Sequence, residues 1–124
     1  MTEHLTVTIK VVWDEERITD LWSQVMGGAF EYCSWWREVR YIGEADWDKP
    51  GKVTLVIENP GSTGAKTKRK TIGPKDVVQA LYTAMERGHR DACTGRPITE
   101  HMDWDQCSSD VVLQIAVLGE VVYG

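Results

Sequence analysis

The segment 111–118 constrains the fold of this chain more than any other feature. Its apolar residues surround most of a helix's circumference; they are Val111, Val112, Ile115, Ala116, Val117 and Leu118. A helix with so wide an apolar face has to be covered by other elements on several sides. We therefore expect a central helix that is capped by Asp103 or Asp105 and ends at Gly119.

Two other segments have helical spacing. Asp14–Glu16 supplies a cap and first-turn acids to the first of them. Its apolar face comprises Ile18, Leu21, Trp22, Val25 and Met26, and we expect Gly27–Gly28 to end it. The second opens with Gly73–Pro74 and stops at Gly88. Its apolar face comprises Val77, Val78, Leu81, Ala84 and Met85.

Four segments are typical of strands. Leu5–Val11 alternates apolar and polar residues, which predicts a first strand with one buried face. The aromatic-rich segment Phe30–Ile42 predicts a second strand, and Val53–Ile57 a third. The polar segment Lys66–Ile72 predicts a fourth strand at an edge, where lysines prevent sheet-to-sheet association.

These elements predict an α+β fold in the order β-α-β-β-β-α-α. A small antiparallel sheet of about four strands packs against three helices. We expect residues 1–124 to form a single domain, because the length suits one core and no linker interrupts the chain.

Composition restricts the class of protein. No apolar run is long enough for a membrane span. The odd number of cysteines, three at irregular spacings, favours free thiols in a reducing compartment and therefore a cytoplasmic protein. No closely spaced pair of cysteines or histidines suits zinc. We expect neither a bound metal nor a cofactor.

The net charge of −5 is unevenly distributed. Four basic residues lie in one strip: Lys66, Lys68, Arg69 and Lys70. Without these four, ten basic residues face nineteen acidic ones. Direct nucleic-acid binding is therefore not expected, since phosphate contacts need a basic surface. An acidic body suits a partner with a basic surface, or the charge serves solubility alone.

Six tryptophans in 124 residues are the most unusual feature of the composition. Tyr32, Trp35 and Trp36 lie close to Arg37 and Arg40. Aromatic faces beside arginines suit a stacked planar ligand or the anchor of a protein interface. The alternative is that these rings fill the core. Neighbours on a strand face opposite sides, so we expect either Trp35 or Trp36 to point away from the core unless both faces are covered.

Three acids, Asp103, Asp105 and Asp110, lie near the start of the last helix. Carboxylates in different surroundings can perform acid–base chemistry. Helix capping accounts for the same positions, and we favour it.

The ending Asp110–Gly124 resembles that of a family of small phage and prophage accessory proteins, whose pattern is D-V-x-L-Q-x-A-L-F-G-E-V-V-Y-G. Leu118 stands where that pattern has an aromatic residue. Gly27–Gly28 and Tyr32–Trp36 resemble the family's Gly-Gly and Tyr-Trp element. The resemblance implies a small non-structural phage protein acting inside the infected cell, where such proteins often inhibit host defence or capture signalling nucleotides.

Three hypotheses of function follow. The first is a non-enzymatic inhibitor of a host protein complex, such as a CRISPR effector or another nucleic-acid-binding defence effector. The second is a nucleotide sponge in which the aromatic residues stack the base, while Arg37, Arg40 or the strip around Lys68 and Arg69 holds phosphates. The third, for which no motif exists, is an enzyme that uses Asp103, Asp105 and Asp110.

Overall fold

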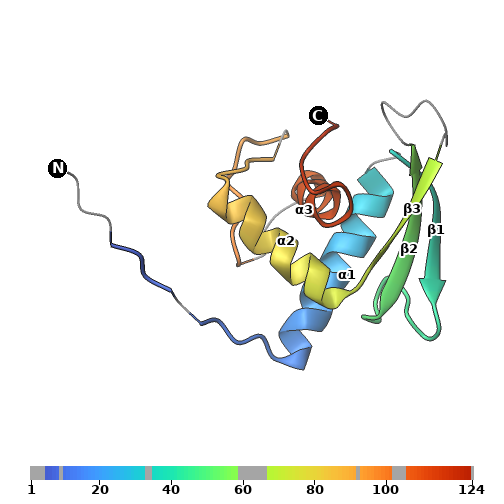
Figure 1. Ribbon diagram of the computed structural model, residues 1–124, viewed down its shortest axis with the longest axis horizontal. Coiled ribbons are helices and arrows are strands. Elements are labelled where there is room, and N and C mark those ends of the chain that lie inside the picture. Colours follow the sequence, from blue (N-terminus) through green and yellow to red (C-terminus); the bar gives the residue numbers. More distant parts are fainter. Residues whose placement is uncertain are drawn as a thin grey trace.

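The computed structural model describes residues 5–8, 10–32, 35–58, 67–91, 93–101 and 106–123, with Glu31 and Tyr32 described by their backbone alone. Its elements are α1 (Glu15–Tyr32), β1 (Trp36–Ile42), β2 (Lys52–Glu58), β3 (Thr67–Ile72), α2 (Pro74–Glu86) and α3 (Gln106–Leu118). The three helices lie on one face of the sheet, and α3 contacts both α1 and α2 (Figure 1). The predicted α+β class is confirmed.

The sheet has the order β1-β2-β3, with antiparallel neighbours. On β2, buried Val53, Leu55 and Ile57 alternate with partly exposed Thr54 and Val56. This alternation turns one face of the sheet toward the helices and leaves the other open. The basic segment forms β3 at an edge of the sheet, as predicted.

The sheet has three strands within the described residues, so the prediction of about four was too high. In the described parts of Leu5–Val11, residues 5–8 and 10–11, the chain forms no strand. This segment extends away from the body (Figure 1). The side chains of Leu5 and Val7 are 90 % and 69 % exposed. Alternation predicts extended backbone, but a strand also needs an adjacent edge for pairing.

The start of β1 differs from the prediction in two respects. Residues up to Tyr32 belong to α1, and the strand begins only at Trp36. A register shift between Trp36 and Glu38 then places Trp36 opposite Ile57 and Val39 opposite Leu55. Because a bulge adds one residue to a strand, Trp36 shares the core face with Val39. Trp35 and Trp36 both pack against the core, so the expectation that one ring points away is wrong.

Gly27–Gly28 does not end α1, which continues for four residues beyond this pair. A Cβ atom at Gly28 would lie 2.7 Å from Ser109 Oγ, which belongs to α3. A Cβ atom at Gly27 would lie 3.4 Å from the ring of Trp47. In addition, Ser109 Oγ donates a hydrogen bond to the carbonyl oxygen of Gln24 at 3.0 Å. Gly28 therefore permits the close crossing of α1 and α3.

Substitution of Gly28 with alanine should lower the free energy of unfolding. Alanine gains about 1 kcal/mol of helix propensity, but overpacking against Ser109 costs about 1–3 kcal/mol, so we expect a net loss of up to about 2 kcal/mol. Gly27→Ala is the matched control, because Trp47 is half-exposed and free to move. Urea unfolding of both variants measures the difference. A stabilised Gly28→Ala protein would refute the close crossing.

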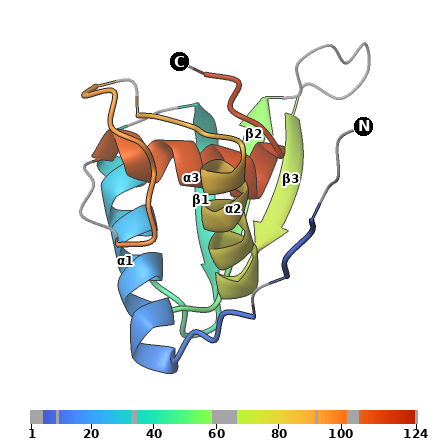
Figure 2. The same ribbon diagram turned by 90° about the vertical axis from the view of Figure 1, so that its left-hand side faces the viewer.

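The other two helices agree with the prediction. α2 begins at Pro74, with the Asp76 carboxylate accepting a hydrogen bond from the backbone N–H of Gly73 at 2.8 Å. α3 crosses α1 and α2 (Figure 2). Its residues Val112, Leu113 and Gln114 are fully buried, which confirms its central position. Gly119, with φ of 82°, follows its last turn. Asp103 and Asp105, the predicted caps, lie outside the described residues.

The cysteines differ from the prediction of free thiols. Cys93 and Cys107 form a disulfide, with their Cα atoms 6.1 Å apart. Cys33 lies outside the described residues. Within the described part of the chain, none of the helices combines the length and the apolar character of a membrane span.

Candidate functional site

Asp110 is not a helix cap, because it lies one turn inside α3 and is buried. The indole Nε1 of Trp35 donates a hydrogen bond to Asp110 Oδ1 at 2.7 Å. Gln114 Nε2 donates to Asp110 Oδ2 at 2.9 Å. Each carboxylate oxygen therefore has a fixed partner, and the side chain joins α3 to the residue preceding β1.

Gln114 holds the C-terminal segment against α3. Its Oε1 accepts hydrogen bonds from the backbone N–H groups of Val122 and Tyr123, each at 2.9 Å. Its Nε2 also donates to the carbonyl oxygen of Tyr123 at 2.9 Å. The Tyr123 ring stacks on Trp35, with centroids 6.1 Å apart and planes at 10°. The distinctive residues of the C-terminal motif thus form one structural network.

The predicted basic residues lie apart from this network. Arg37 pairs with Glu58, its Nε donating to Oε1 at 2.6 Å, and Arg40 pairs with Glu38 at 2.9 Å. Arg40 lies on the open face of the sheet, with Arg69 on β3 beside Val56. Lys68 is opposite core-facing Ile57 but is exposed, because β3 is at the edge. The structure does not bring these cations to the rings of Trp35 and Trp36.

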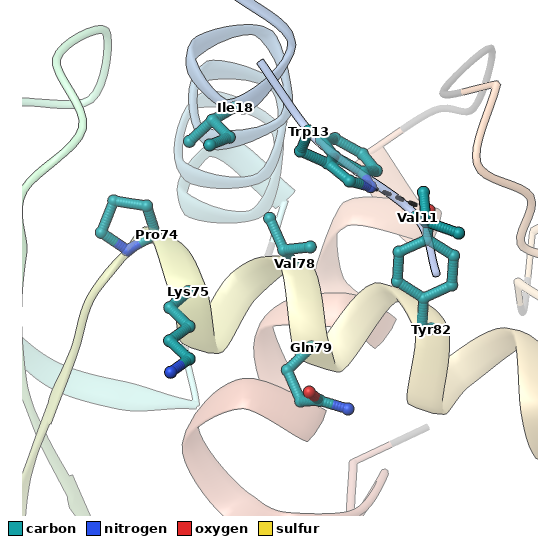
Figure 3. Close-up of a pocket in the computed structure, with 8 residues that line it drawn as sticks. All are labelled: Val11, Trp13, Ile18, Pro74, Lys75, Val78, Gln79 and Tyr82. Atoms are coloured by element: carbon teal, nitrogen blue, oxygen red, sulfur yellow. Dashed lines mark hydrogen bonds between the residues drawn. The ribbon is translucent and has the colours of Figure 1, made fainter. Parts of the chain in front are cut away.

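A hollow between the first two helices was not foreseen from the sequence. We call it the Trp13–Tyr82 groove; it has a volume of about 790 Å³ and lies between the start of α1 and α2 (Figure 3). It is lined by Val11, Trp13, Ile18, Pro74, Lys75, Val78, Gln79 and Tyr82. Figure 3 shows Ile18, Val78 and Trp13 facing one another across its centre. The lining is mainly apolar, as in most ligand-binding pockets.

Polar contacts fix one wall of this groove. Trp13 Nε1 donates to the Tyr82 hydroxyl at 2.8 Å, and that hydroxyl donates to Glu100 at 3.0 Å. The Arg17 guanidinium lies 3.9 Å from the Trp13 ring centroid and 3.4 Å from the Glu100 carboxylate. Because both large rings are held in this way, the wall is formed before any ligand arrives.

An exposed apolar arm leads into the groove. We define the apolar arm as residues 5–8 and 10–12. One of these residues, Val11, also lines the groove. Leu5, Val7 and Val12 are strongly exposed, and Val11 is 45 % exposed. In an extended chain the intervening Thr6 and Thr8 face the opposite side. Apart from Val12, the arm is the described part of the predicted first strand, and it pairs with none of the strands of the sheet.

A second, smaller hollow lies at the β1 edge. We call it the aromatic hollow; it has a volume of about 350 Å³ and is lined by Met26, Gly27, Phe30, Tyr41 and Trp47. The side chain of Trp47 is 51 % exposed. The Tyr41 hydroxyl is buried without a hydrogen-bond partner. Burial, and then the carboxylates of Asp46 and Asp48, raise the pKa of Tyr41 to about 12.

Within the described residues, no group of three or more His, Cys, Asp or Glu side chains is arranged to hold a metal ion. Comparisons with known proteins found no matching family model, no matching curated protein and no matching solved structure. The resemblance to phage accessory proteins therefore rests on the sequence motif alone.

Proposed function

We propose that this protein is a non-enzymatic inhibitor that binds a host protein complex through the apolar arm and the Trp13–Tyr82 groove. The observation that carries the proposal is the exposure of Leu5 and Val7 on an extended, unpaired segment. Contiguous exposed apolar surface is typical of interaction sites. An extended segment also offers backbone hydrogen bonds to the edge of a partner's sheet, while its alternate side chains enter pockets.

The groove extends this surface toward the body of the protein. Its fixed wall of Trp13 and Tyr82 suits the insertion of an apolar side chain, because little ordering is needed on binding. The net charge of −5 favours a partner with a basic surface. Together with the phage resemblance, this charge makes a nucleic-acid-binding defence effector, such as a CRISPR effector, the partner that we propose. The site of action would then be the cytoplasm of the host cell.

The two other hypotheses receive less support from the geometry. A nucleotide sponge requires stacking rings beside phosphate-binding cations, but Arg37 and Arg40 pair with glutamates, away from the stacked Trp35 and Tyr123 rings. An enzyme that uses Asp110 would have to break the hydrogen bonds that join Asp110 to Trp35 and Gln114.

The test compares two double variants of the arm. Leu5→Asp with Val7→Asp changes the apolar side, and Thr6→Asp with Thr8→Asp adds the same charge to the opposite side. Tagged proteins are incubated with host lysate, and retained proteins and nucleotides are identified by mass spectrometry. We expect a nucleic-acid-binding complex to be retained by the wild type and the threonine variant. The leucine–valine variant should retain at least about tenfold less, since each buried aliphatic side chain contributes roughly 1.5–3 kcal/mol.

Two results would contradict the proposal. Equal retention by both double variants would show that the apolar side of the arm is not the contact. A bound nucleotide without a protein partner would instead support the sponge. Inhibition is tested separately, by adding the purified protein to the identified complex and measuring its nuclease or nucleic-acid-binding activity.

A further inference from the structure

The aromatic hollow has walls that meet at steep angles. The Phe30 and Tyr41 rings lie 6.4 Å apart, centroid to centroid, with planes at 63°. Trp47 contributes a third ring, which lies over Gly27 on α1. Three rings around one small volume present several π faces to whatever enters. The absence of a side chain at Gly27 leaves room for the Trp47 ring.

The charge around this hollow is negative. Asp46 and Asp48 flank Trp47 in the turn between β1 and β2, and all three residues are exposed. Burial and then the negative charges of both carboxylates raise the pKa of Tyr41, because they disfavour its phenolate form. An anionic ligand would meet the same repulsion, whereas a cation would be attracted by the carboxylates and by the ring faces.

The hydroxyl of Tyr41, beside this hollow, is a buried polar group without a hydrogen-bond partner. Tyr41 is one of the residues that line the hollow. Buried polar groups without partners are uncommon and call for an explanation. Because this oxygen is closed off from the surface, a ligand with an N–H or polarised C–H group donates to it only if the Tyr41 ring shifts toward the hollow.

We propose that the aromatic hollow binds an alkylammonium cation, held by the ring faces of Phe30, Tyr41 and Trp47 and by the field of Asp46 and Asp48. The chemistry is that of a quaternary or methylated ammonium group, whose apolar surface fits the rings while its charge is diffuse. Such a group belongs either to a free small molecule or to a methylated lysine of a protein partner. The aromatic hollow shares no lining residue with the Trp13–Tyr82 groove, so this proposal does not rest on the function proposed for the arm.

Matched ligands separate charge from apolar contact. Choline is compared with 3,3-dimethylbutanol, its neutral isostere, by calorimetry and by the shift of the Trp47 indole N–H signal. We expect choline to bind at least about tenfold more tightly than the isostere, because cation–π attraction acts on the charged ligand alone. A peptide with trimethyllysine provides the second source: tighter binding of the peptide assigns the site to a protein partner, and tighter binding of choline assigns it to a small molecule.

Matched variants locate the site. Trp47→Leu should weaken choline binding by at least about fivefold, and Asp48→Asn by about threefold, since each removes one attraction. Glu44→Gln removes an exposed charge from the same turn and should change the affinity by less than about twofold, since the carboxylates that act on Tyr41 are those of Asp46 and Asp48. Bound choline should also lower the pKa of Tyr41 in a phenolate absorbance titration.

Equal affinity for choline and its isostere would overturn the proposal, as would the absence of binding by both cationic probes. Equal effects of Asp48→Asn and Glu44→Gln would also overturn it. Circular dichroism of each variant confirms folding, which we expect to persist because Trp47, Asp48 and Glu44 are exposed.

Discussion

Replacement of Gln114 with leucine should lower the free energy of unfolding by about 3 kcal/mol or more, since the buried Asp110 carboxylate loses a partner, at about 1–3 kcal/mol, and three further hydrogen bonds are lost, at about 1 kcal/mol each. The leucine side chain has similar size, so the effect is one of hydrogen bonding. The Asp110 carboxylate loses the amide of Gln114, and the backbone of Val122 and Tyr123 loses three contacts. Urea unfolding, followed by circular dichroism, measures the change.

Gln79→Leu is the matched control, because Gln79 is an exposed residue of α2. It should change the free energy of unfolding by less than about 0.5 kcal/mol, as surface substitutions usually do. Hydrogen exchange adds a local readout: the amides of Val122 and Tyr123 should lose protection in Gln114→Leu and keep it in the control. A loss of stability without faster exchange at these two amides would show that Gln114 does not hold the C-terminal segment.

Local signals were sufficient to predict α2 and α3. Gly73–Pro74 and Gly88 mark the two ends of α2, and the spacing of its apolar residues gives the buried face. The breadth of the apolar face of segment 111–118 predicted that α3 would be central, and nearly all of α3 is buried. In α2 the residues that set the boundaries are close in sequence, so no tertiary contact was needed to recognise them.

Errors arose where a distant contact overrides a local preference. Gly27–Gly28 has the composition of a helix end, but its function depends on Ser109 in α3 and on Trp47. The faces of β1 depend on a bulge that alternation alone does not reveal. Likewise, Leu5–Val11 has a strand pattern, but no strand forms in its described residues because pairing depends on a neighbouring edge.

The candidate sites were harder to predict than the fold. The Trp13–Tyr82 hydrogen bond joins residues 69 positions apart, and the Trp35–Asp110 bond joins residues 75 apart. Composition showed that tryptophans are abundant, but not which of them line a hollow. Trp47 offered a signal that could have been used, because it lies between Asp46 and Asp48 in the segment that joins the predicted second and third strands and is therefore a candidate for exposure.

Reduction of the Cys93–Cys107 disulfide should lower the free energy of unfolding by about 3 kcal/mol, the value expected for a closed loop of roughly 15 residues. The bond joins the loop after α2 to the first turn of α3. Asp91 strengthens the same junction: burial alone would raise its pKa, yet hydrogen bonds from Thr94 and Ser108 hold the pKa below its usual range. Loss of the disulfide should therefore increase the mobility of the loop, whereas the hydrogen bond between Asp91 and Ser108 still joins the loop to α3.

Cys93→Ser tests this prediction without disturbing the core, because Cys93 is exposed whereas Cys107 is buried. The variant and the reduced wild type should show the same loss of stability, and reductant should have no further effect on the variant. Since disulfides seldom persist in a reducing cytoplasm, a wild type insensitive to reductant would fit the proposed site of action and refute the role of the bond in stability. A loss of about 3 kcal/mol in both would instead mean that a protein acting in the host cytoplasm works in its less stable, reduced form.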